Sequence, residues 1–204
     1  MKKIFFLAAL VCSILVCNAE KVHRVDDFKD GESKFGFEAK ATKKYSVTMD
    51  GEYLVVTAKK DPWCMVGQKF PITVRQNFHL SYDLIFPKLD EDHIFGLVFN
   101  YEEDESRPEK STGDVLCITE NKFFLADQNG RKAGKVEKMK LKKGKNVPVH
   151  VDIEKKGKKM LISINGIDFE YEDLEISSPY MGFWVNEKNT MKVDKVTISQ
   201  ILSD

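Results

Sequence analysis

The sequence of 204 residues has very little that is typical of helices. After Ala19, no stretch repeats apolar residues at i, i+3, i+4 and i+7 over a convincing length. Residues 172–177 could hold one helical turn at most. The missing helical period argues against a helical fold and leaves alternating, strand-like patterns as the main structural signal.

An excess of charge of one sign is missing as well. The whole chain carries 32 basic and 32 acidic residues. Without Lys2 and Lys3, which belong to an N-terminal segment discussed below, 30 basic residues face 32 acidic ones, a net charge near −2. A surface with this balance has no overall field that steers polyanions, so neither nucleic acid nor an anionic membrane is expected as a partner.

The motifs of several enzyme classes are absent. The chain has no Gly-x-Ser-x-Gly nucleophile elbow, no Walker A sequence and no dinucleotide-binding glycine pattern. The four histidines stand without an adjacent cysteine or serine motif of the kind that supports nucleophilic catalysis. They are His23, His79, His93 and His150. The sequence therefore predicts a protein that is not an enzyme.

Cysteine is scarce beyond Ala19. Cys12 and Cys17 precede this alanine, which leaves Cys64 and Cys117. In an oxidising compartment these two could form a disulfide that closes a long loop. Alternatively, both are buried free thiols, because cysteine also behaves as a small hydrophobic residue. Two cysteines without paired ligands nearby make a zinc site a poor interpretation.

Residues 1–19 have the pattern of a secretory signal peptide. Two lysines form its basic beginning, an apolar run covers residues 4–16, and Ala19 ends a small-residue cleavage site. Lipidation at Cys17 is the alternative, although a valine precedes this cysteine where bacterial lipoproteins usually have a small residue. The apolar run is too short for an ordinary membrane span. The protein is predicted to be exported and to be secreted, periplasmic or at the cell surface.

Short alternating segments are what the sequence has in abundance. The clearest series is NVPVHVDIEKKGKKMLISINGIDFEY at residues 146–171. Apolar and polar residues alternate in its first part, which predicts a strand with one buried face. A lysine-glycine turn at 155–158 and the tight-turn pair Asn165-Gly166 then separate two further strands. These residues predict a three-stranded antiparallel meander.

The same pattern predicts strands along most of the chain. They are expected at residues 45–49, 53–57, 73–86, 94–101, 114–118, 122–126, 180–185 and 193–201. Five large apolar residues of one segment share a face and mark a core strand: Phe78, Leu80, Tyr82, Leu84 and Phe86. Residues 61–64 interrupt the alternation and are interpreted as a loop or bulge. Roughly ten to thirteen short strands predict an all-β sandwich or barrel, and residues 20–204 are predicted to form a single domain.

Several of these segments occur in an order that resembles a known superfamily. NVPVHVDIEKKG, a strand ending in Ile164-Asn165-Gly166, the later SPYMGFWV and the closing VDKVTIS resemble the concanavalin A-like lectin/glucanase superfamily, particularly its laminin-G-like and bacterial secreted members. The glycine-containing segment 95–99 (FGLVF) fits a central strand of that fold. The resemblance implies a jelly roll of two antiparallel sheets, one of them curved to leave a concave face. It also implies a glycan, or a glycoprotein, as partner.

Sugar binding by a β-sandwich needs aromatic faces for stacking and a few polar groups for hydroxyls. Trp63 is a candidate because it follows Asp61-Pro62 in the expected loop, and Trp184 because it faces away from Phe183 and Val185 on its strand. The candidate polar groups are Asn100, Tyr101 and Asn186. The alternative is that both tryptophans belong to the core, since tryptophan is highly buried on average.

Acidic residues support catalysis or metal binding only weakly. Retaining glucanases of the superfamily carry a Glu-x-Asp-x-Glu strand, whereas this chain has only Asp152-Ile153-Glu154, with His150 on the same face. A solvated polar strand face is the preferred interpretation. The acidic turn with Asp26, Asp27 and Asp30 could bind calcium, because this ion prefers carboxylate oxygens as ligands.

The sequence therefore favours an exported, non-catalytic β-sandwich that binds carbohydrate at a concave face or at rim loops. Two alternatives stay open at this stage. One is a structural or protein-interaction module of a surface or periplasmic assembly, and the other is a glycoside hydrolase-like domain with a diverged site.

Overall fold

The computed structural model of the chain describes residues 20–60, 63–89, 94–104, 110–126, 132–142, 144–172, 175–186 and 188–202. The predicted signal peptide at residues 1–19, with Cys12 and Cys17, lies outside the described residues. So do Asp61, Pro62 and His93.

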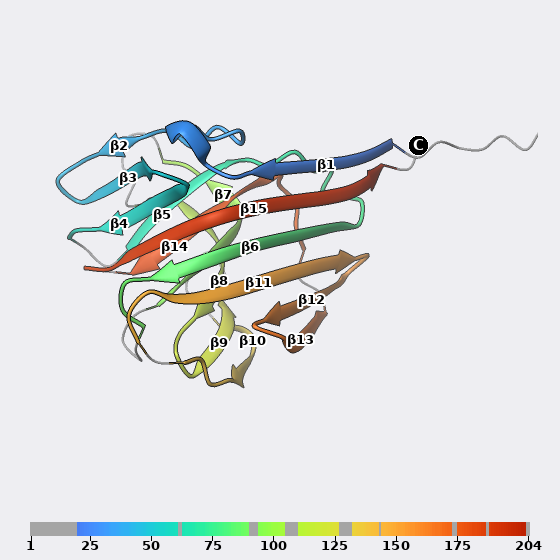
Figure 1. The fold of residues 1–204 in the computed structure, drawn as a ribbon. Helices are drawn as coiled ribbons and strands as arrows, with labels where there is room; N and C mark the ends of the chain where they lie inside the picture. The colour runs from blue at the N-terminus through green and yellow to red at the C-terminus, as the bar shows by residue number, and fades with distance from the viewer. Residues whose placement is uncertain are drawn as a thin grey trace, which may run out of the picture.

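The described residues form two antiparallel sheets packed face to face, as Figure 1 shows. The nine-stranded sheet contains, in spatial order, β13 (Ile167–Glu172), β12 (Lys159–Ile164), β11 (Val147–Lys156), β6 (Phe78–Phe86), β15 (Thr190–Leu202), β4 (Tyr53–Ala58), β3 (Tyr45–Asp50) and β2 (Lys40–Ala41), with β1 (Glu20–Asp26) paired to β15. The six-stranded sheet contains β10 (Lys132–Lys138), β9 (Lys122–Ala126), β8 (Thr112–Ile118), β7 (Phe95–Glu102), β14 (Tyr180–Asn186) and β5 (Trp63–Lys69). A short 3-10 helix, η1 (Lys29–Gly31), follows β1. The prediction of an all-β sandwich of the jelly-roll type is confirmed.

The core lies between the sheets and is rich in aromatic side chains. All five apolar residues predicted to share one face of β6 are buried. Across the sandwich, the ring of Phe86 stacks on Phe95 with centroids 3.5 Å apart, and Tyr82 meets Phe183 edge-on at 5.7 Å. Alternation along β6 therefore determines which of its side chains the second sheet covers.

The central meander forms as predicted, with one difference in its first turn. The chain turns back at Gly157 and Lys158, so β11 extends to Lys156 and includes lysines that were expected to lie in the turn. Asn165 and Gly166 have positive φ angles of 50° and 79°, which is the conformation that this dipeptide accepts. The three strands make one end of the nine-stranded sheet.

At β6 and β5 the structure differs from the prediction because distant parts of the chain supply the partners of these segments. β6 begins at Phe78 and not at residue 73, since the buried amide of Gln200 binds the backbone of Thr73. Gln200 Oε1 accepts from the Thr73 N–H (2.6 Å) and its Nε2 donates to the Thr73 carbonyl (2.8 Å). Trp63 and Cys64 were expected in a loop, yet they begin β5, which pairs with β14 over its whole length. Sequence alone missed β5 because apolar and polar residues do not alternate in it.

The N-terminal segment is fastened to the sandwich by three aromatic side chains. Phe28, Phe35 and Phe37 are buried, and the ring of Phe37 packs on Phe183 with centroids 5.7 Å apart. The fully buried carboxylate of Asp26 accepts hydrogen bonds from the Phe28 N–H (3.2 Å), the Phe35 N–H (2.9 Å) and the Ser33 hydroxyl (2.5 Å). Asp26, one of the predicted calcium ligands, therefore uses its carboxylate to hold the N-terminal segment.

Cys64 and Cys117 do not form a disulfide. Both are buried free thiols. Cys64 of β5 belongs to the core between the sheets, whereas Cys117 of β8 belongs to an apolar cluster on the opposite face of the six-stranded sheet. Two strands separate β5 from β8, which places them roughly 14 Å apart at ~4.8 Å a strand, far beyond the reach of a disulfide. Of the two alternatives, the buried-thiol interpretation is the correct one.

Candidate functional site

Most of the predicted ligand residues gather on the outer face of the six-stranded sheet. Trp63 pairs with Asn186, and Met65 pairs with Trp184, so these four side chains share one face. It is the outer face, because Cys64 and Val185, which alternate with them, are buried in the core. Trp63 is 41% exposed and Trp184 is partly buried against the outer apolar cluster. The interpretation of the tryptophans as core residues is therefore wrong for Trp63.

Two further aromatic residues extend this row. Tyr180, 45% exposed, lies on the same face of β14 as Trp184, four residues and ~13 Å along the strand. The ring of Tyr101 on β7 lies against Gly67, where an added Cβ would come within 2.3 Å of the ring. The name outer aromatic face is used below for Trp63, Met65, Tyr101, Tyr180 and Trp184.

The two predicted asparagine ligands hold the backbone. Asn100 has a positive φ of 51° at a bulge of β7, and its Nδ2 donates to Asp114 (2.6 Å) and to the Glu175 carbonyl (2.8 Å). Its Oδ1 accepts from the Ser177 and Ser178 N–H groups. Asn186 Oδ1 accepts from the Ile94 N–H at 3.0 Å. These amides position the segments around the outer aromatic face, and we do not include them among its contact groups.

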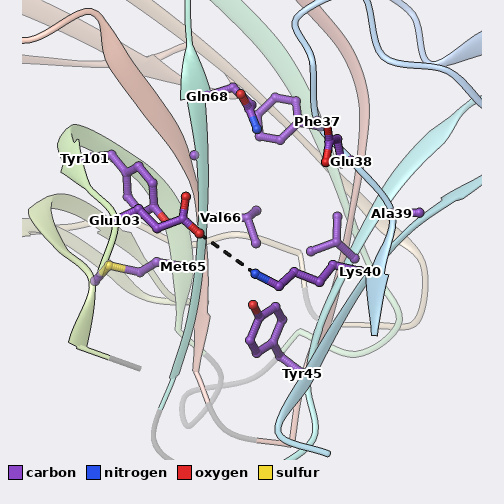
Figure 2. A pocket seen from close by; sticks show the side chains of 12 residues that line it. Phe37, Glu38, Ala39, Lys40, Tyr45, Met65, Val66, Gln68, Tyr101 and Glu103 are labelled. Carbon is purple, nitrogen blue, oxygen red and sulfur yellow. Dashed lines mark ion pairs between the residues drawn. The ribbon is translucent and has the colours of Figure 1, made fainter. Parts of the chain in front are cut away.

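A pocket of about 280 Å³ adjoins the outer aromatic face at the edge strand β5. Met65 and Gly67 form one wall and the segment from Phe37 to Lys40 the other. Figure 2 shows Lys40 and Glu103 pointing toward each other across the pocket, with their charged atoms 3.9 Å apart. The hydroxyl-bearing ring of Tyr45 lies beside Lys40. The pocket thus offers charged and hydroxyl groups next to an exposed aromatic row.

The buried phenol and thiol groups of this sheet are neutral. Burial raises the pKa of Tyr101 to about 12, and the nearby Glu103 charge acts in the same direction. Burial likewise raises the pKa of the Cys64 and Cys117 thiols to about 12. A thiol with such a pKa is not a nucleophile at neutral pH.

The second candidate site, around Asp152, lies on the outer face of the other sheet. His150 Nδ1 is 2.7 Å from Asp83 Oδ1, and its Nε2 is 2.8 Å from Asp152 Oδ2. The second Asp152 oxygen is 2.9 Å from His79 Nε2. Because both ring nitrogens of His150 face carboxylate oxygens, this geometry favours the imidazolium form. Glu154, by contrast, is paired with Lys156 at 2.8 Å.

His79, Asp83, His150 and Asp152 form a polar ladder across β6 and β11, and we expect it to make stability depend on pH. Burial lowers the pKa of His150, but hydrogen bonds to Asp83 and Asp152 outweigh it, and the net pKa lies above 6.5. The His150 contribution is therefore fully present below pH 6.5 and is lost as the pH rises through the raised value. Burial raises the pKa of Asp152, but His150 and its other neighbours lower it overall. The contribution of Asp152 to stability is therefore fully present above pH 3.8 and is lost only at more acidic pH.

We expect His150→Gln to reduce the free energy of unfolding by less than about 1 kcal/mol at pH 5.5, since the pair is largely exposed. At pH 8.5 the difference from the wild type should be smaller. Urea unfolding at the two pH values measures this. His23→Gln is the matched control, because the ring of His23 is 2.8 Å from the hydroxyl of Ser199 and pairs with no carboxylate of the described residues. An equal effect of His150→Gln at both pH values would contradict the claim that the charged form of His150 stabilises the fold.

Two further properties concern metal and membrane. In the described parts of the chain, no three histidine, cysteine, aspartate or glutamate side chains converge as metal ligands. Asp27, another predicted calcium ligand, is 2.7 Å from Lys34.

Among the described residues, there is no helix with the length and apolar character of a membrane span.

The fold is similar to that of solved lectin domains, which confirms the architecture that the sequence resemblance implied. No family model matches the sequence, and no curated protein matches it. Among solved structures, the carbohydrate recognition domain of Emp47p is similar, with a TM-score of 0.63, 9% identity, and 88% of this chain and 95% of that chain covered.

Two other solved structures share the architecture. The exoplasmic/lumenal domain of VIP36, solved with Ca²⁺ and Man3GlcNAc bound, has a TM-score of 0.57 and 5% identity over 78% of this chain and 83% of that chain. A structure from work on endo-acting O-glycanases of the human gut microbiota has a TM-score of 0.55 and 13% identity, covering 90% and 92%. At these identities the similarity establishes the fold alone.

The sequence analysis named the two tryptophans and Tyr101 as ligand candidates but not their neighbours on the same face, Met65 and Tyr180. Met65 and Tyr180 could have been found from the alternation Trp63-x-Met65-x-Gly67 and Tyr180-x-Gly182-x-Trp184. The pocket at Lys40 and Glu103 had no such signal, because the two side chains are far apart in the sequence and no motif connects them.

Proposed function

We propose that the protein is an exported, non-catalytic β-sandwich module that binds a glycan, free or on a glycoprotein, through the outer aromatic face. The observation that carries the proposal is the exposed indole of Trp63 beside Trp184, in a row that continues to Tyr180 and borders a polar pocket. Aromatic faces bind the apolar faces of sugar rings, and nearby polar groups bind hydroxyls. The lectin domains among the similar folds support this choice of ligand class.

The non-catalytic part of the proposal rests on the chemistry of the reactive groups. Burial raises the pKa of Asp152, but the hydrogen bonds from His150 and Ser81 and the charges of His150 and His79 together lower it overall, so this carboxyl is unsuited to donate a proton at neutral pH. Glu154 is tied to Lys156. The thiols are buried, with raised pKa values. Export rests on the sequence pattern of residues 1–19.

The first experiment is a glycan-array screen of the purified protein with and without added calcium, followed by calorimetry on the best saccharide. Trp63→Ala is expected to weaken binding by about 2 kcal/mol, roughly thirtyfold in Kd, because the stacked apolar area is lost. Leu161→Ala is the matched control, since Leu161 is 40% exposed but lies on the other sheet. Silence across the array, or equal binding by Trp63→Ala and the wild type, would overturn the proposal in favour of a protein-interaction module.

A hydrolase-like function is the second candidate, and one observation favours it. On the outer face of the nine-stranded sheet, burial and the nearby Asp83 and Glu52 raise the pKa of Asp194, while that of Asp152 is lowered. Carboxyl groups whose pKa values are driven apart are typical of acid–base pairs. This candidate predicts glycan cleavage that is lost in Asp152→Asn and Asp194→Asn. Unchanged turnover in both variants would exclude this site.

A further inference from the structure

The balanced charge of the whole chain conceals a local concentration of cations. Two pockets, of about 680 and 480 Å³, lie at the end of the sandwich where the loop between β5 and β6 meets the β11–β12 turn. Arg75 and Lys155 line both pockets. The name basic end is used for five residues that line one or both of them: Lys21, Arg75, Lys155, Lys156 and Lys158.

Lys155 is the unusual member of this group. It occupies an inward-facing position of β11, in register with the buried Phe78, and is only 7% exposed. Its Nζ donates to the Gln76 carbonyl at 3.4 Å, and in the described part of the chain it has no carboxylate partner. Burial lowers its pKa. A buried ammonium is normally paired with an anion, because desolvation of an unpaired charge is unfavourable.

The loop between β5 and β6 that carries Arg75 is fastened at two points, and Arg75 lines the same two pockets as Lys155. Gln200 binds the backbone of Thr73, two residues before Arg75. On the other side, Asn77 Oδ1 accepts from the Gly157 N–H at 2.8 Å and joins this loop to the β11–β12 turn. The guanidinium is thus presented from a fastened backbone. Its planar set of donors suits a carboxylate or sulfate group.

Few acidic groups compensate these cations. Of the two glutamates that line the pockets, Glu154 is paired with Lys156 at 2.8 Å, and Glu175 lies only in the smaller pocket. His79, in the larger pocket, is bound to Asp152. Asn77 and Ser199 add amide and hydroxyl groups beside the cations. The lining therefore combines excess positive charge with neutral polar groups.

We propose that the basic end binds a linear acidic saccharide, with its carboxylate or sulfate groups on Arg75 and Lys155. The two pockets on either side of these residues accommodate the adjoining sugar units, and the amide and hydroxyl groups contact their hydroxyls. The ligand supplies a counter-charge to Lys155, which has no carboxylate partner among the described residues. Nucleic acid is the less suitable polyanion, because the basic end has only five cationic residues, on a protein without net positive charge. This second site lies on other elements than the outer aromatic face.

The test is calorimetry of the full chain with three oligosaccharides of equal length: a sulfated heparin fragment, an oligogalacturonate and a neutral maltooligosaccharide. Binding of at least one acidic probe, and none of the neutral probe at this end, is expected. Arg75→Gln and Lys155→Met should each raise the Kd at least tenfold. Lys59→Gln, at the opposite end of the sandwich beyond β4, should change it less than twofold.

Thermal unfolding separates loss of a site from loss of the fold. Lys155→Met keeps a stem of similar length and removes the desolvated charge, so its melting temperature should equal or exceed that of the wild type. Trp63→Ala should leave binding of the acidic probe unchanged, which makes the two sites distinguishable. The proposal is overturned if neither acidic probe binds, or if both charge variants bind like the wild type. Equal affinity for a single-stranded oligonucleotide of the same charge would overturn the choice of ligand class.

Discussion

Gly96→Ala is expected to destroy cooperative folding. Gly96 lies on β7, between β8 and β14, and an added Cβ would come within 1.5 Å of the Leu116 carbonyl oxygen of the neighbouring strand. No rotamer relieves this overlap, because the neighbour is backbone. Relief requires separation of β7 from β8, so we expect a loss above about 4 kcal/mol. This is a large share of the ~5–15 kcal/mol that stabilises a typical domain.

Urea unfolding, with far-UV circular dichroism and tryptophan fluorescence as probes, measures this effect. Gly67→Ala is the matched comparison, since there the added Cβ meets the side chain of Tyr101 at 2.3 Å and not the backbone. Its effect should therefore be smaller, and in a Tyr101→Ala background it should nearly vanish. A cooperative transition for Gly96→Ala within about 1 kcal/mol of the wild type would show that the strand spacing described here is wrong.

Asp26→Ala is expected to lower the free energy of unfolding by about 3 kcal/mol. The substitution leaves the buried N–H groups of Phe28 and Phe35 without their acceptor and frees the hydroxyl of Ser33. Each unsatisfied buried donor costs about 1–3 kcal/mol. Because these hydrogen bonds hold the turn that carries the aromatic anchors, the N-terminal segment should also become accessible to protease. Denaturant unfolding and limited proteolysis measure the two effects.

The same experiment discriminates between the structural role and the predicted calcium site. Asp27→Ala serves as control, since the ion pairs of Asp27 with Lys29 and Lys34 are at the surface and their loss should hardly move the midpoint. A chelator added to the wild-type protein should leave the midpoint unchanged. A decrease with chelator as large as that of Asp26→Ala would instead assign a bound cation to this carboxylate.

The physical nature of the signals explains how much could be predicted from the sequence. Alternation of apolar and polar residues is a local property, and it correctly predicted the buried face of β6, the meander of β11–β13 and the opposite facing of Phe183 and Trp184. Turn chemistry is equally local, as the positive φ angles of Asn165 and Gly166 confirm. Strand β5 escaped prediction because apolar and polar residues do not alternate along it, and only its pairing with β14 makes it a strand.

Other features were decided by which strands become neighbours. Whether Cys64 and Cys117 could pair depended on the faces and the strand order of the six-stranded sheet. The ladder of His79, Asp83, His150 and Asp152 exists because β6 and β11, which are distant in the sequence, pair in one register. The hydrogen bonds between the Gln200 side chain and the Thr73 backbone, which precede the start of β6, likewise join distant parts of the chain.

By itself, the sequence determined the class of fold, most of the strands and the residues that share a strand face, because these follow from interactions over a few residues. Only the tertiary structure decided that Trp63 is exposed beside Trp184, that Asn100 is committed to the backbone, and that Lys155 lies buried without a carboxylate among the described residues. Those outcomes depend on register and sheet order, which arise from the packing of the whole chain and have no signature in a short segment.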